Sequence, residues 1–281
     1  MRYYCNIPIE SAAFDKAPVI LQSIPFDGTS TWGKGADKGF IAFMDATDNM
    51  EVYDIETDSE IYRRGIHVLE EFNGLTDPSE MFTAVYARTK ELISLGKMVT
   101  SFGGEHSVSI PLIRAHYESY PDVSVLQLDA HADLRPTYLG TPYNHACALY
   151  DASQQCNLVQ VGIRSAEREE LKYAQKGNVF WAQEMLKTST WMRNSLDRLG
   201  ENVYITIDLD VFDPSILPGT GTPEPGGLGW YEVLDFLRSV FANKNVLGFD
   251  IVELAPIPGH RSSEFLAAKL YYKMLSYYFD R

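Results

Sequence analysis

The sequence predicts one α/β domain over residues 1–281, with three α/β/α layers around a mostly parallel sheet of about eight strands. Short apolar runs rich in β-branched and aromatic residues recur along the chain, and helical patterns lie between them. Most of these runs are apolar throughout, as in strands that are covered on both faces. No repeat, low-complexity stretch or linker-like segment divides the chain. Strands that alternate with helices in this way are typical of a sheet between two helical layers.

The apolar runs give the expected strands. They are Pro18–Gln22, Glu51–Ile55, Lys97–Phe102, Val123–Leu128, Leu158–Val161, Val179–Trp181, Val203–Ile207 and Val246–Val252. Each run is short, as strands in globular proteins usually are.

The clearest helix is expected from Asp77 to Leu95. Asp77 is suited to the N-cap, Pro78 to the first helical position and Gly96 to the end. Further helices are expected after Ser107 and over Glu167–Lys176, Gln183–Leu199, Tyr231–Ala242 and Ser262–Tyr278.

The composition excludes several classes of protein. The 281 residues include 24 Lys and Arg against 38 Asp and Glu, a formal charge of −14, and such a surface repels nucleic acid. An apolar fraction of 45% excludes a disordered chain, and no run reaches the ~18 apolar residues that span a membrane. The charge is compatible with a small cationic substrate, although solubility alone also explains it.

Cysteine usage and the first residues indicate a cytoplasmic protein. Cys5, Cys147 and Cys156 are too few, and odd in number, for a disulfide framework. The start, MRYYCNIPIE, lacks the basic-then-apolar pattern of a signal peptide.

Chemistry is expected beyond the carboxyl ends of the strands, where ligands bind in open parallel sheets. Polar residues follow strands in four segments: Gly103-Gly104-Glu105-His106-Ser107, Asp129-Ala130-His131-Ala132-Asp133, Asp208-Leu209-Asp210, and Asp250 with Glu253. The two glycines alone could form a tight turn, and a D-x-D pair alone also occurs in metal-dependent transferases. Two acids and a histidine at alternate positions after an apolar strand are much more specific.

Six residues of these segments are expected to converge into a metal centre. They are His106, Asp129, His131, Asp133, Asp208 and Asp210. In extended chain, side chains two residues apart share a face, so the members of each segment can point the same way. Carboxylates held close together are costly, because buried unpaired ions cost about several kcal/mol each and like charges raise each other's pKa. Two divalent cations would neutralise them.

The donor set indicates which metals fit and what they could do. Oxygen ligands with some imidazole and no thiolate favour Mn²⁺ over a structural zinc, while Fe²⁺, Co²⁺, Ni²⁺ and catalytic Zn²⁺ stay open. Two metals ~3.5–4 Å apart can bridge a water and convert it to hydroxide near neutral pH. The sequence therefore predicts metal-assisted hydrolysis.

Four motifs occur in the same order as in a known protein family. They are GGEHS (Gly103–Ser107), DAHADLR (Asp129–Arg135), DLDVFDPSILPGTGTPEPGGL (Asp208–Leu228) and DIVELAP (Asp250–Pro256). On these motifs the chain resembles the ureohydrolase family of arginases and agmatinases, with the closer likeness to the agmatinase branch. PFDGTSTWGKGADKG (Pro25–Gly39) is similar to the family's N-terminal loop, so the resemblance covers nearly the whole chain.

The resemblance implies an arginase-like fold, two Mn²⁺ per chain and assembly into trimers or hexamers. In the implied ligand set, His106, Asp129, Asp133 and Asp210 serve the first metal or the bridge, and His131 and Asp208 complete the second. A metal-bridging hydroxide, steadied by Asp133, would attack the guanidinium carbon of the substrate.

The resemblance also implies roles for residues outside the metal set. Glu253 would bind the substrate guanidinium, because a planar cation pairs naturally with a carboxylate. Thr222 would orient that acid. His145 would shuttle a proton to the leaving amine, a role that suits imidazole, although a loop histidine bonded to backbone is the alternative.

The chain departs from the family pattern in ways that affect the substrate tail. Gly39-Phe40 replaces the usual Gly-Pro, and the residues after His145 lack an arginine-rich stretch. Arg135 stands where arginases place an asparagine for the amino-acid end of arginine, which disfavours free arginine and is compatible with a carboxylate tail. Glu224 could pair with a cationic tail or simply face solvent.

We therefore expect hydrolysis of a linear guanidino compound, agmatine to putrescine and urea. Aminopropylagmatine, guanidinobutyrate and formiminoglutamate are alternative substrates. A mononuclear zinc deacylase of related fold and a non-catalytic relative acting as a binding or regulatory subunit are alternative functions. Metal content separates these: two metals per chain for the hydrolase, one for the deacylase and none for the non-catalytic relative.

Overall fold

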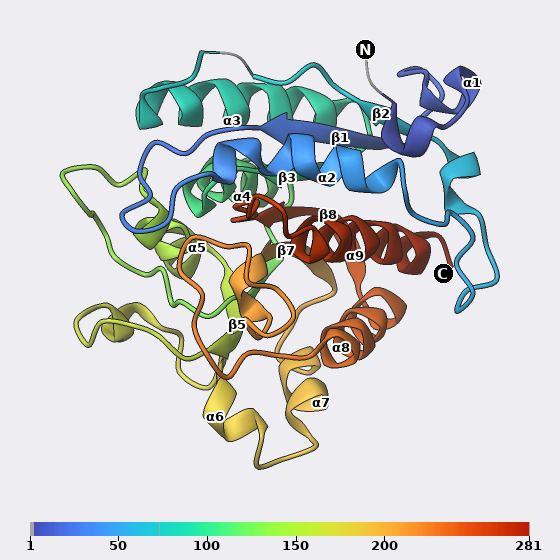
Figure 1. Cartoon of the computed structure of the whole chain (residues 1–281). Coiled ribbons are helices and arrows are strands. Elements are labelled where there is room, and N and C mark those ends of the chain that lie inside the picture. The colour runs from blue at the N-terminus through green and yellow to red at the C-terminus, as the bar shows by residue number, and fades with distance from the viewer. Residues whose placement is uncertain (1–2, 73, 281) are drawn as a thin grey trace.

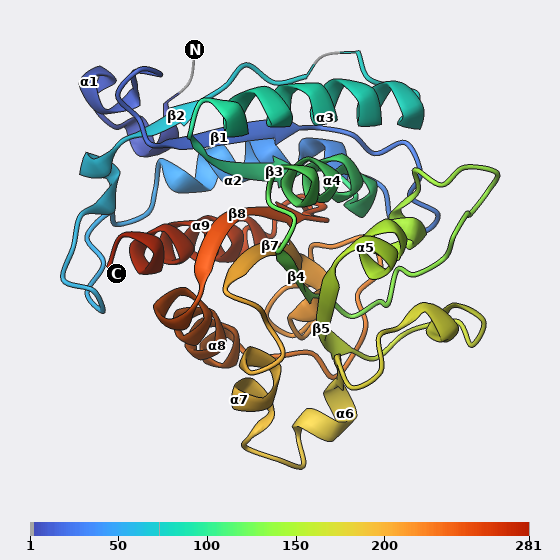
Figure 2. The same cartoon turned by 180° about the vertical axis from the view of Figure 1, so that it is seen from behind.

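A computed structural model describes residues 3–72 and 74–280 of the chain. Its centre is one sheet of eight parallel strands in the order β2-β1-β3-β8-β7-β4-β5-β6. Helices α2, α8 and α9 pack on one face, and α3, α4 and α5 pack on the other (Figures 1 and 2). The predicted three-layer α/β/α fold with a parallel sheet is confirmed.

The strands are short and buried. They are β1 (Val19–Ile24), β2 (Ile66–Val68), β3 (Met98–Gly103), β4 (Ser124–Leu128), β5 (Asn157–Ile163), β6 (Val179–Trp181), β7 (Asn202–Asp208) and β8 (Asn245–Val252). All but β2 overlap an expected run. Nearly every residue of β1, β3, β4, β5 and β7 is buried, which explains why these strands are mostly apolar.

The expected strand at Glu51–Ile55 is wrong, and the edge strand lies further along the chain at Ile66–Val68. Ile55 is 85% exposed, so the apolar residues of the first segment are not part of a covered sheet. The backbone carbonyl of Glu51 accepts a hydrogen bond from Lys269 of α9 instead. Burial on both faces, rather than apolar content, separates the two segments.

The helices differ more from expectation than the strands do. They are α1 (Ile9–Ala12), α2 (Gly39–Thr47), α3 (Pro78–Ser94), α4 (Ser109–Ser119), α5 (Tyr150–Gln155), α6 (Ala182–Met185), α7 (Trp191–Leu196), α8 (Trp230–Asn243) and α9 (Ser262–Phe279). Helix α3 begins as predicted, because Asp77 Oδ1 accepts the backbone N–H groups of Ser79 and Glu80 at 2.9 and 3.0 Å. Gly96 follows it with φ +71°.

Two expected helices are interrupted. Over Glu167–Lys176 only a 3₁₀ turn forms, at Glu170–Tyr173. The buried carboxylate of Glu170 accepts the backbone N–H groups of Leu134 and Glu167 at 3.0 and 2.7 Å, which ties the turn to the loop after β4. Over Gln183–Leu199 the short helices α6 and α7 replace one long helix.

The order of the strands decides where the chemistry lies. Strands β3, β8, β7 and β4 are consecutive neighbours, and each precedes one of the four polar segments. Because all strands are parallel, the four segments meet at one edge of the sheet.

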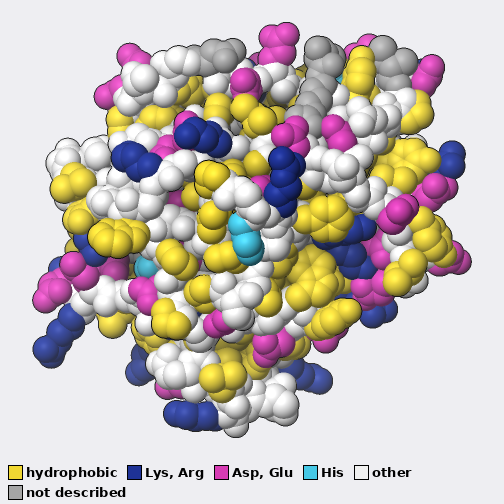
Figure 3. Space-filling model, in the orientation of Figure 1, with side chains coloured by type: hydrophobic (Ala, Val, Ile, Leu, Met, Phe, Trp, Pro, Cys, Tyr) yellow, Lys and Arg dark blue, Asp and Glu magenta, His cyan; other side chains and the backbone are white. Residues whose placement is uncertain are grey.

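The charge of the surface and the apolar length of the helices are relevant to the partners of the protein. On the face in Figure 3, acidic and basic side chains are interspersed with apolar ones, so the excess negative charge does not form one continuous acidic surface there. Among the described residues, no helix is long and apolar enough to cross a membrane.

Candidate active site

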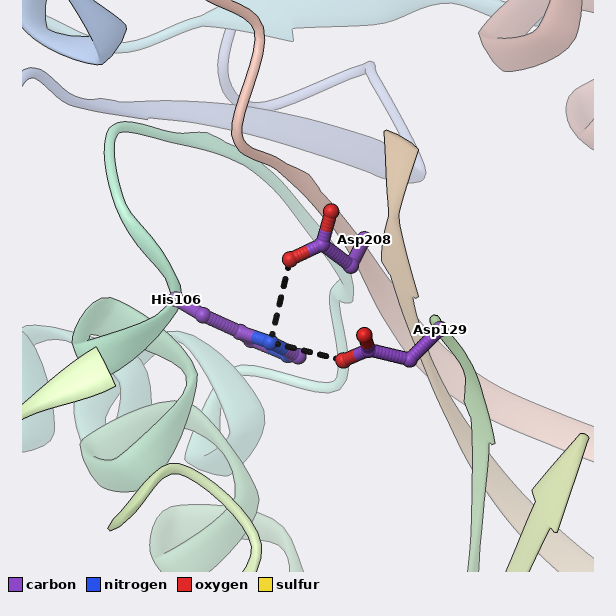
Figure 4. A group of neighbouring side chains, drawn as sticks. All are labelled: His106, Asp129 and Asp208. Atoms are coloured by element: carbon purple, nitrogen blue, oxygen red, sulfur yellow. Dashed lines mark ion pairs between the residues drawn. The ribbon is translucent and has the colours of Figure 1, made fainter. Parts of the chain in front are cut away.

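Four residues of the predicted metal set meet at the imidazole of His106, which begins a 3₁₀ turn after β3. Its Nδ1 atom lies 3.1 Å from Asp129 Oδ2, 3.1 Å from Asp133 Oδ2 and 3.4 Å from Asp208 Oδ2. Figure 4 shows that His106, Asp129 and Asp208 come from three different strand ends and point toward one another. All four side chains are buried. These residues could hold one cation.

The other two predicted residues form a second group with Asp129. The Nδ1 atom of His131 lies 2.8 Å from Asp210 Oδ2 and 3.7 Å from Asp129 Oδ1. Asp129 thus faces both groups, with one oxygen toward each imidazole. Two adjacent groups that share a carboxylate could hold two neighbouring cations.

Two buried atoms of the cluster indicate that divalent cations fit there. His106 Nδ1 and Asp210 Oδ2 are buried, and neither has a hydrogen-bond partner within the described part of the chain. They lie within ion-pair distance of neighbours, but the angles do not suit hydrogen bonds, and buried polar atoms without partners are costly. Imidazole and carboxylate donors without thiolate are suited to a divalent transition metal. The residues therefore fit such a cation in both groups.

A buried hydroxyl fixes which nitrogen of His106 faces the carboxylates. Thr206 Oγ1 lies 3.0 Å from His106 Nε2 and donates to Asp250 Oδ1 at 2.8 Å. A hydroxyl carries one proton, so Thr206 must accept its second bond from Nε2–H of His106. In the neutral imidazole, Nδ1 is then the nitrogen that carries the lone pair, as a metal ligand requires. Asp250 belongs to one of the four polar segments of the sequence, where no metal or catalytic role was predicted for it.

Without cations, burial and crowding raise the pKa of two of the acids, Asp208 and Asp133. Burial, followed by Asp210 and Asp129, raises the pKa of Asp208 well above its usual range. Burial also raises the pKa of Asp133 to about 6. For His106, burial lowers the pKa, but the facing carboxylates outweigh burial and raise the pKa well above its usual value. A metal must displace these protons, so metal affinity is expected to fall with falling pH.

The local backbone differs from the extended chain that the sequence suggested. Asp133 has φ +51°, in the left-handed region, and its carboxylate reaches His106 through a turn. Leu209–Val211 is a 3₁₀ turn in which Asp208 Oδ1 accepts the backbone N–H of Asp210 at 2.8 Å. The alternate spacing therefore predicts residues that do lie together, while turns rather than extended strands bring them there.

Glycine is needed before His106 for close packing. A Cβ atom at Gly104 would lie 1.9 Å from the carbonyl oxygen of Phe26. The carbonyl oxygen of Gly104 accepts the backbone N–H of Glu253 at 2.8 Å. Gly104 thus lets the loops after β1, β3 and β8 approach one another.

Glu253 follows β8 and lies beside the cluster. Its Oε1 atom accepts the backbone N–H of His106 at 2.8 Å, and its backbone has φ +66°. Burial, followed by the neighbouring Glu105, raises the pKa of Glu253 well above its usual range. Thr222 lines the same cavity, and its role in orienting Glu253 stays a prediction.

A cavity of about 280 Å³ opens over the cluster. It is lined by His131, Asp133 and Asp208 of the cluster, by Glu253, and by Arg135, Tyr138, His145 and Glu167, which we call the outer wall. The cavity joins the candidate metal centre to the residues predicted for proton transfer and for the substrate tail.

His145 lies on a 3₁₀ turn at this cavity, with its Nδ1 atom 3.1 Å from Thr29 Oγ1. Burial, followed by His106, His131 and Arg135, lowers the pKa of His145 to about 4. The imidazole is therefore neutral at neutral pH and able to accept a proton. Thr29 was missed in the sequence, where it is one polar residue of a loop.

Arg135 and Glu224, which were predicted to bind the substrate tail, lie beside different partners. Arg135 pairs with Glu167 at 3.1 Å, and its guanidinium lies 4.3 Å from the ring centre of Tyr138. Glu224 Oε1 lies 3.7 Å from Nε2 of His131. A carboxylate in this position is suited to orienting a histidine ligand.

The parallel α/β/α fold and its histidine–carboxylate cluster are the features of a metal-binding protein of the α/β class. Residues 17–276 match the model of the arginase family. The chain belongs to this family of ureohydrolases.

Relatives and solved structures agree with this membership. The chain is 36% identical over 280 residues to an N(1)-aminopropylagmatine ureohydrolase of Synechocystis sp., with 95% of this chain and 90% of the relative covered. It is 33% identical over 255 residues to an agmatinase of Halalkalibacterium halodurans, with 86% of each covered. The structure of agmatine ureohydrolase of Thermoplasma volcanium matches with a TM-score of 0.87 at 28% identity, with 95% of this chain and 92% of that chain covered.

Proposed function

We propose that this protein is a binuclear manganese ureohydrolase that hydrolyses agmatine to putrescine and urea. The observation that carries the proposal is the position of Glu253, a buried carboxylate on the wall of the cavity that also exposes the cation-binding groups. One oxygen of Glu253 is held by the N–H of His106, which leaves the other for a guanidinium. A guanidinium bound there lies beside the atoms that would activate water.

The proposed metal ligands are His106, Asp129, Asp133 and Asp208 on one side and Asp129, His131 and Asp210 on the other. When bound, two Mn²⁺ ions would supply a water acidic enough to attack at neutral pH and positive charge opposite the developing negative charge. The oxygen-rich donor set supports manganese.

The chain's own residues bind and orient the reactants. Glu253 accepts hydrogen bonds from the planar guanidinium and fixes its carbon over the cluster. Asp133, which lines the cavity, accepts a hydrogen bond from the attacking water and so aims its lone pair at that carbon. The bond between the carbon and the tail nitrogen then breaks to give urea and the amine.

His145 moves a proton in this scheme. Because its pKa is low, the neutral imidazole first accepts a proton released by the attacking water. It then donates that proton to the tail nitrogen, which departs as an amine. His145 lines the same cavity as Asp133 and Glu253, which supports this role.

The outer wall of the cavity supports a cationic tail rather than a carboxylate. Arg135 is already neutralised by Glu167, so it offers little attraction to the carboxylate of a guanidino acid. Glu167 is 59% exposed at its side chain against 23% for Arg135, so the acid is the partner of this pair that an ammonium group can reach from solvent. Agmatine carries such a group opposite its guanidinium.

Aminopropylagmatine is a second candidate, because the relatives at 36% identity carry the name N(1)-aminopropylagmatine ureohydrolase. Its longer tail carries one more cation and would extend past Glu167 into solvent. We also propose a cytoplasmic homo-oligomer, a trimer or hexamer, which light scattering on the purified protein tests.

Urea release tests the proposed function. The manganese-loaded protein is assayed on agmatine, aminopropylagmatine, arginine and guanidinobutyrate, and its metal content is measured by mass spectrometry. We expect two metals per chain, and kcat/KM for a cationic-tail substrate at least about 100-fold above that for arginine or guanidinobutyrate. Two bound metals without urea from any substrate would refute the proposal, and one metal would favour a deacylase.

A further inference from the structure

The hydroxyl of Thr29 joins a buried acid to the imidazole of His145. Thr29 Oγ1 lies 2.7 Å from Glu105 Oε2 and 3.1 Å from His145 Nδ1. The same oxygen accepts the backbone N–H of His145 at 3.0 Å. Three segments that are far apart in the sequence therefore meet at one hydroxyl oxygen.

The carboxyl oxygens of Glu105 accept several hydrogen bonds. Its side chain is fully buried and accepts the hydroxyl of Ser107 at 2.5 Å, in addition to that of Thr29. The backbone N–H of Ser107 also points at it, at 3.5 Å. Within the described part of the chain, two hydroxyl groups and one amide point at the Glu105 carboxyl oxygens, which act as acceptors.

This arrangement determines the tautomer of His145. The single proton of the Thr29 hydroxyl goes to Glu105, and one of its lone pairs takes the backbone N–H of His145. The remaining lone pair can only accept, so it takes the Nδ1–H of the ring. The Nε2 atom of His145 is then left unprotonated on the opposite side of the ring.

The two bonds from His145 also fix the direction of its ring. Because the backbone N–H and the ring Nδ1–H end on the same oxygen, the imidazole cannot rotate without breaking one of them. The Tyr138 ring meets the imidazole edge-on, with centres 6.2 Å apart, and confines it on the cavity side.

We propose that Thr29, held by Glu105, is a positioning residue that sets the tautomer and orientation of His145 for proton transfer. The inference rests on the proposed role of His145 as the group that moves a proton. A histidine with the opposite tautomer would present N–H where a proton has to be accepted.

Thr29→Val tests the proposal, because valine keeps the shape of threonine and removes the hydroxyl. We expect kcat to fall about tenfold, with KM and metal content unchanged, since the imidazole is misplaced rather than removed. Thr29→Ser restores the hydroxyl and should restore most of kcat. Ser30→Ala is the matched control, because the Ser30 hydroxyl next to it has no hydrogen-bond partner among the described residues.

A double-mutant cycle asks whether Thr29 acts through His145. In a His145→Ala background, Thr29→Val should change kcat by less than about twofold, because no imidazole remains to position. An equal loss in both backgrounds, a loss of metal, or an unchanged kcat in the single variant would each overturn the inference. If the valine variant does not fold, Thr29→Ala takes its place in the cycle.

A spectroscopic measurement is independent of turnover. The ring ¹⁵N spectrum of the protein loaded with diamagnetic Zn²⁺ gives the tautomer of His145, which is assigned by the signal lost in His145→Ala. A proton on Nδ1 in the wild type supports the inference, and a proton on Nε2 contradicts it. A wild type that shows the Nδ1 proton yet releases no urea would refute the proposed function and leave the positioning intact.

Discussion

The hydroxyl of Thr206 binds the imidazole of His106 on the side away from the carboxylates, at 3.0 Å from Nε2. Because Asp250 takes the proton of that hydroxyl, Nε2 keeps its own proton, and Nδ1 is the nitrogen that could offer a lone pair to a cation once its proton is displaced. Thr206 and Asp250 thus orient His106 without lying among the proposed metal ligands.

Removal of the Thr206 hydroxyl should weaken metal binding. In Thr206→Val, the imidazole of His106 loses its acceptor, so we expect the affinity of the weaker-bound Mn²⁺ to fall about 10–100-fold. Thr206→Ser keeps the hydroxyl and serves as the control. Isothermal titration of the metal-free protein measures both variants, and equal affinities would show that Thr206 does not orient the ligand.

Asp210→Asn should remove charge from the cluster while it preserves local structure. The Oδ1 atom that accepts the N–H of Ala130 at 3.0 Å remains available in asparagine. We expect the metal content to fall from two per chain to one or fewer, because Oδ2 beside His131 is lost as an anionic donor. Asp235→Asn, at an exposed acid on α8, is the control, and mass spectrometry gives the stoichiometry. Two metals in the Asp210 variant would exclude it as a ligand.

Glu253→Gln separates substrate binding from metal binding. Glutamine still accepts the N–H of His106 but no longer pairs with a guanidinium. We expect both metals to stay bound while kcat/KM for agmatine falls at least about 100-fold, as befits the loss of a buried charge-assisted contact. A variant that retains its activity would disprove the assignment of Glu253.

Glu167→Gln should change which tails are accepted. Arg135 would lose its partner and become available to a carboxylate. We expect the ratio of kcat/KM for guanidinobutyrate to that for agmatine to rise about three- to tenfold, a modest change because Glu167 is largely exposed. Arg135→Gln in the same background should cancel the rise. An unchanged ratio would mean that the pair lies beyond the reach of the tail.

His116 should make the fold less stable in acid. Burial lowers the pKa of His116 to about 4, against ~6.5 in the unfolded chain. Between these values the unfolded state binds more protons, so the free energy of unfolding falls as the pH falls through this window. From pH 7.5 to pH 5 the loss due to His116 is about 2 kcal/mol. Urea unfolding with chelator should show a smaller loss in His116→Phe by this amount, and equal losses would contradict the assignment.

The sequence was sufficient to predict which histidines and carboxylates come together, because parallel strands bring the segments that follow them to one edge. It did not determine how those residues are held. The left-handed backbone of Asp133 and the 3₁₀ turn at Leu209–Val211 depend on hydrogen bonds between loops, which local patterns do not encode.

The parts that the sequence missed share a physical cause. Ile66–Val68 and Glu51–Ile55 are similarly apolar, and only packing decides which one joins the sheet. Thr29 has its partners 76 and 116 residues away, and a threonine in a polar loop gives no sign of them. Helix α3, in contrast, has its cap and its end encoded locally.

The positive φ angles of Asp133 and Glu253, +51° and +66°, limit how far the cavity can be redesigned. Glycine, asparagine and aspartate adopt this conformation most readily, and a β-branched residue would be strained there whatever its chemistry. A library aimed at new guanidine substrates can therefore vary Arg135, Tyr138 and Glu167 of the outer wall. At these two positions the backbone conformation excludes most replacements, whichever substrate is intended.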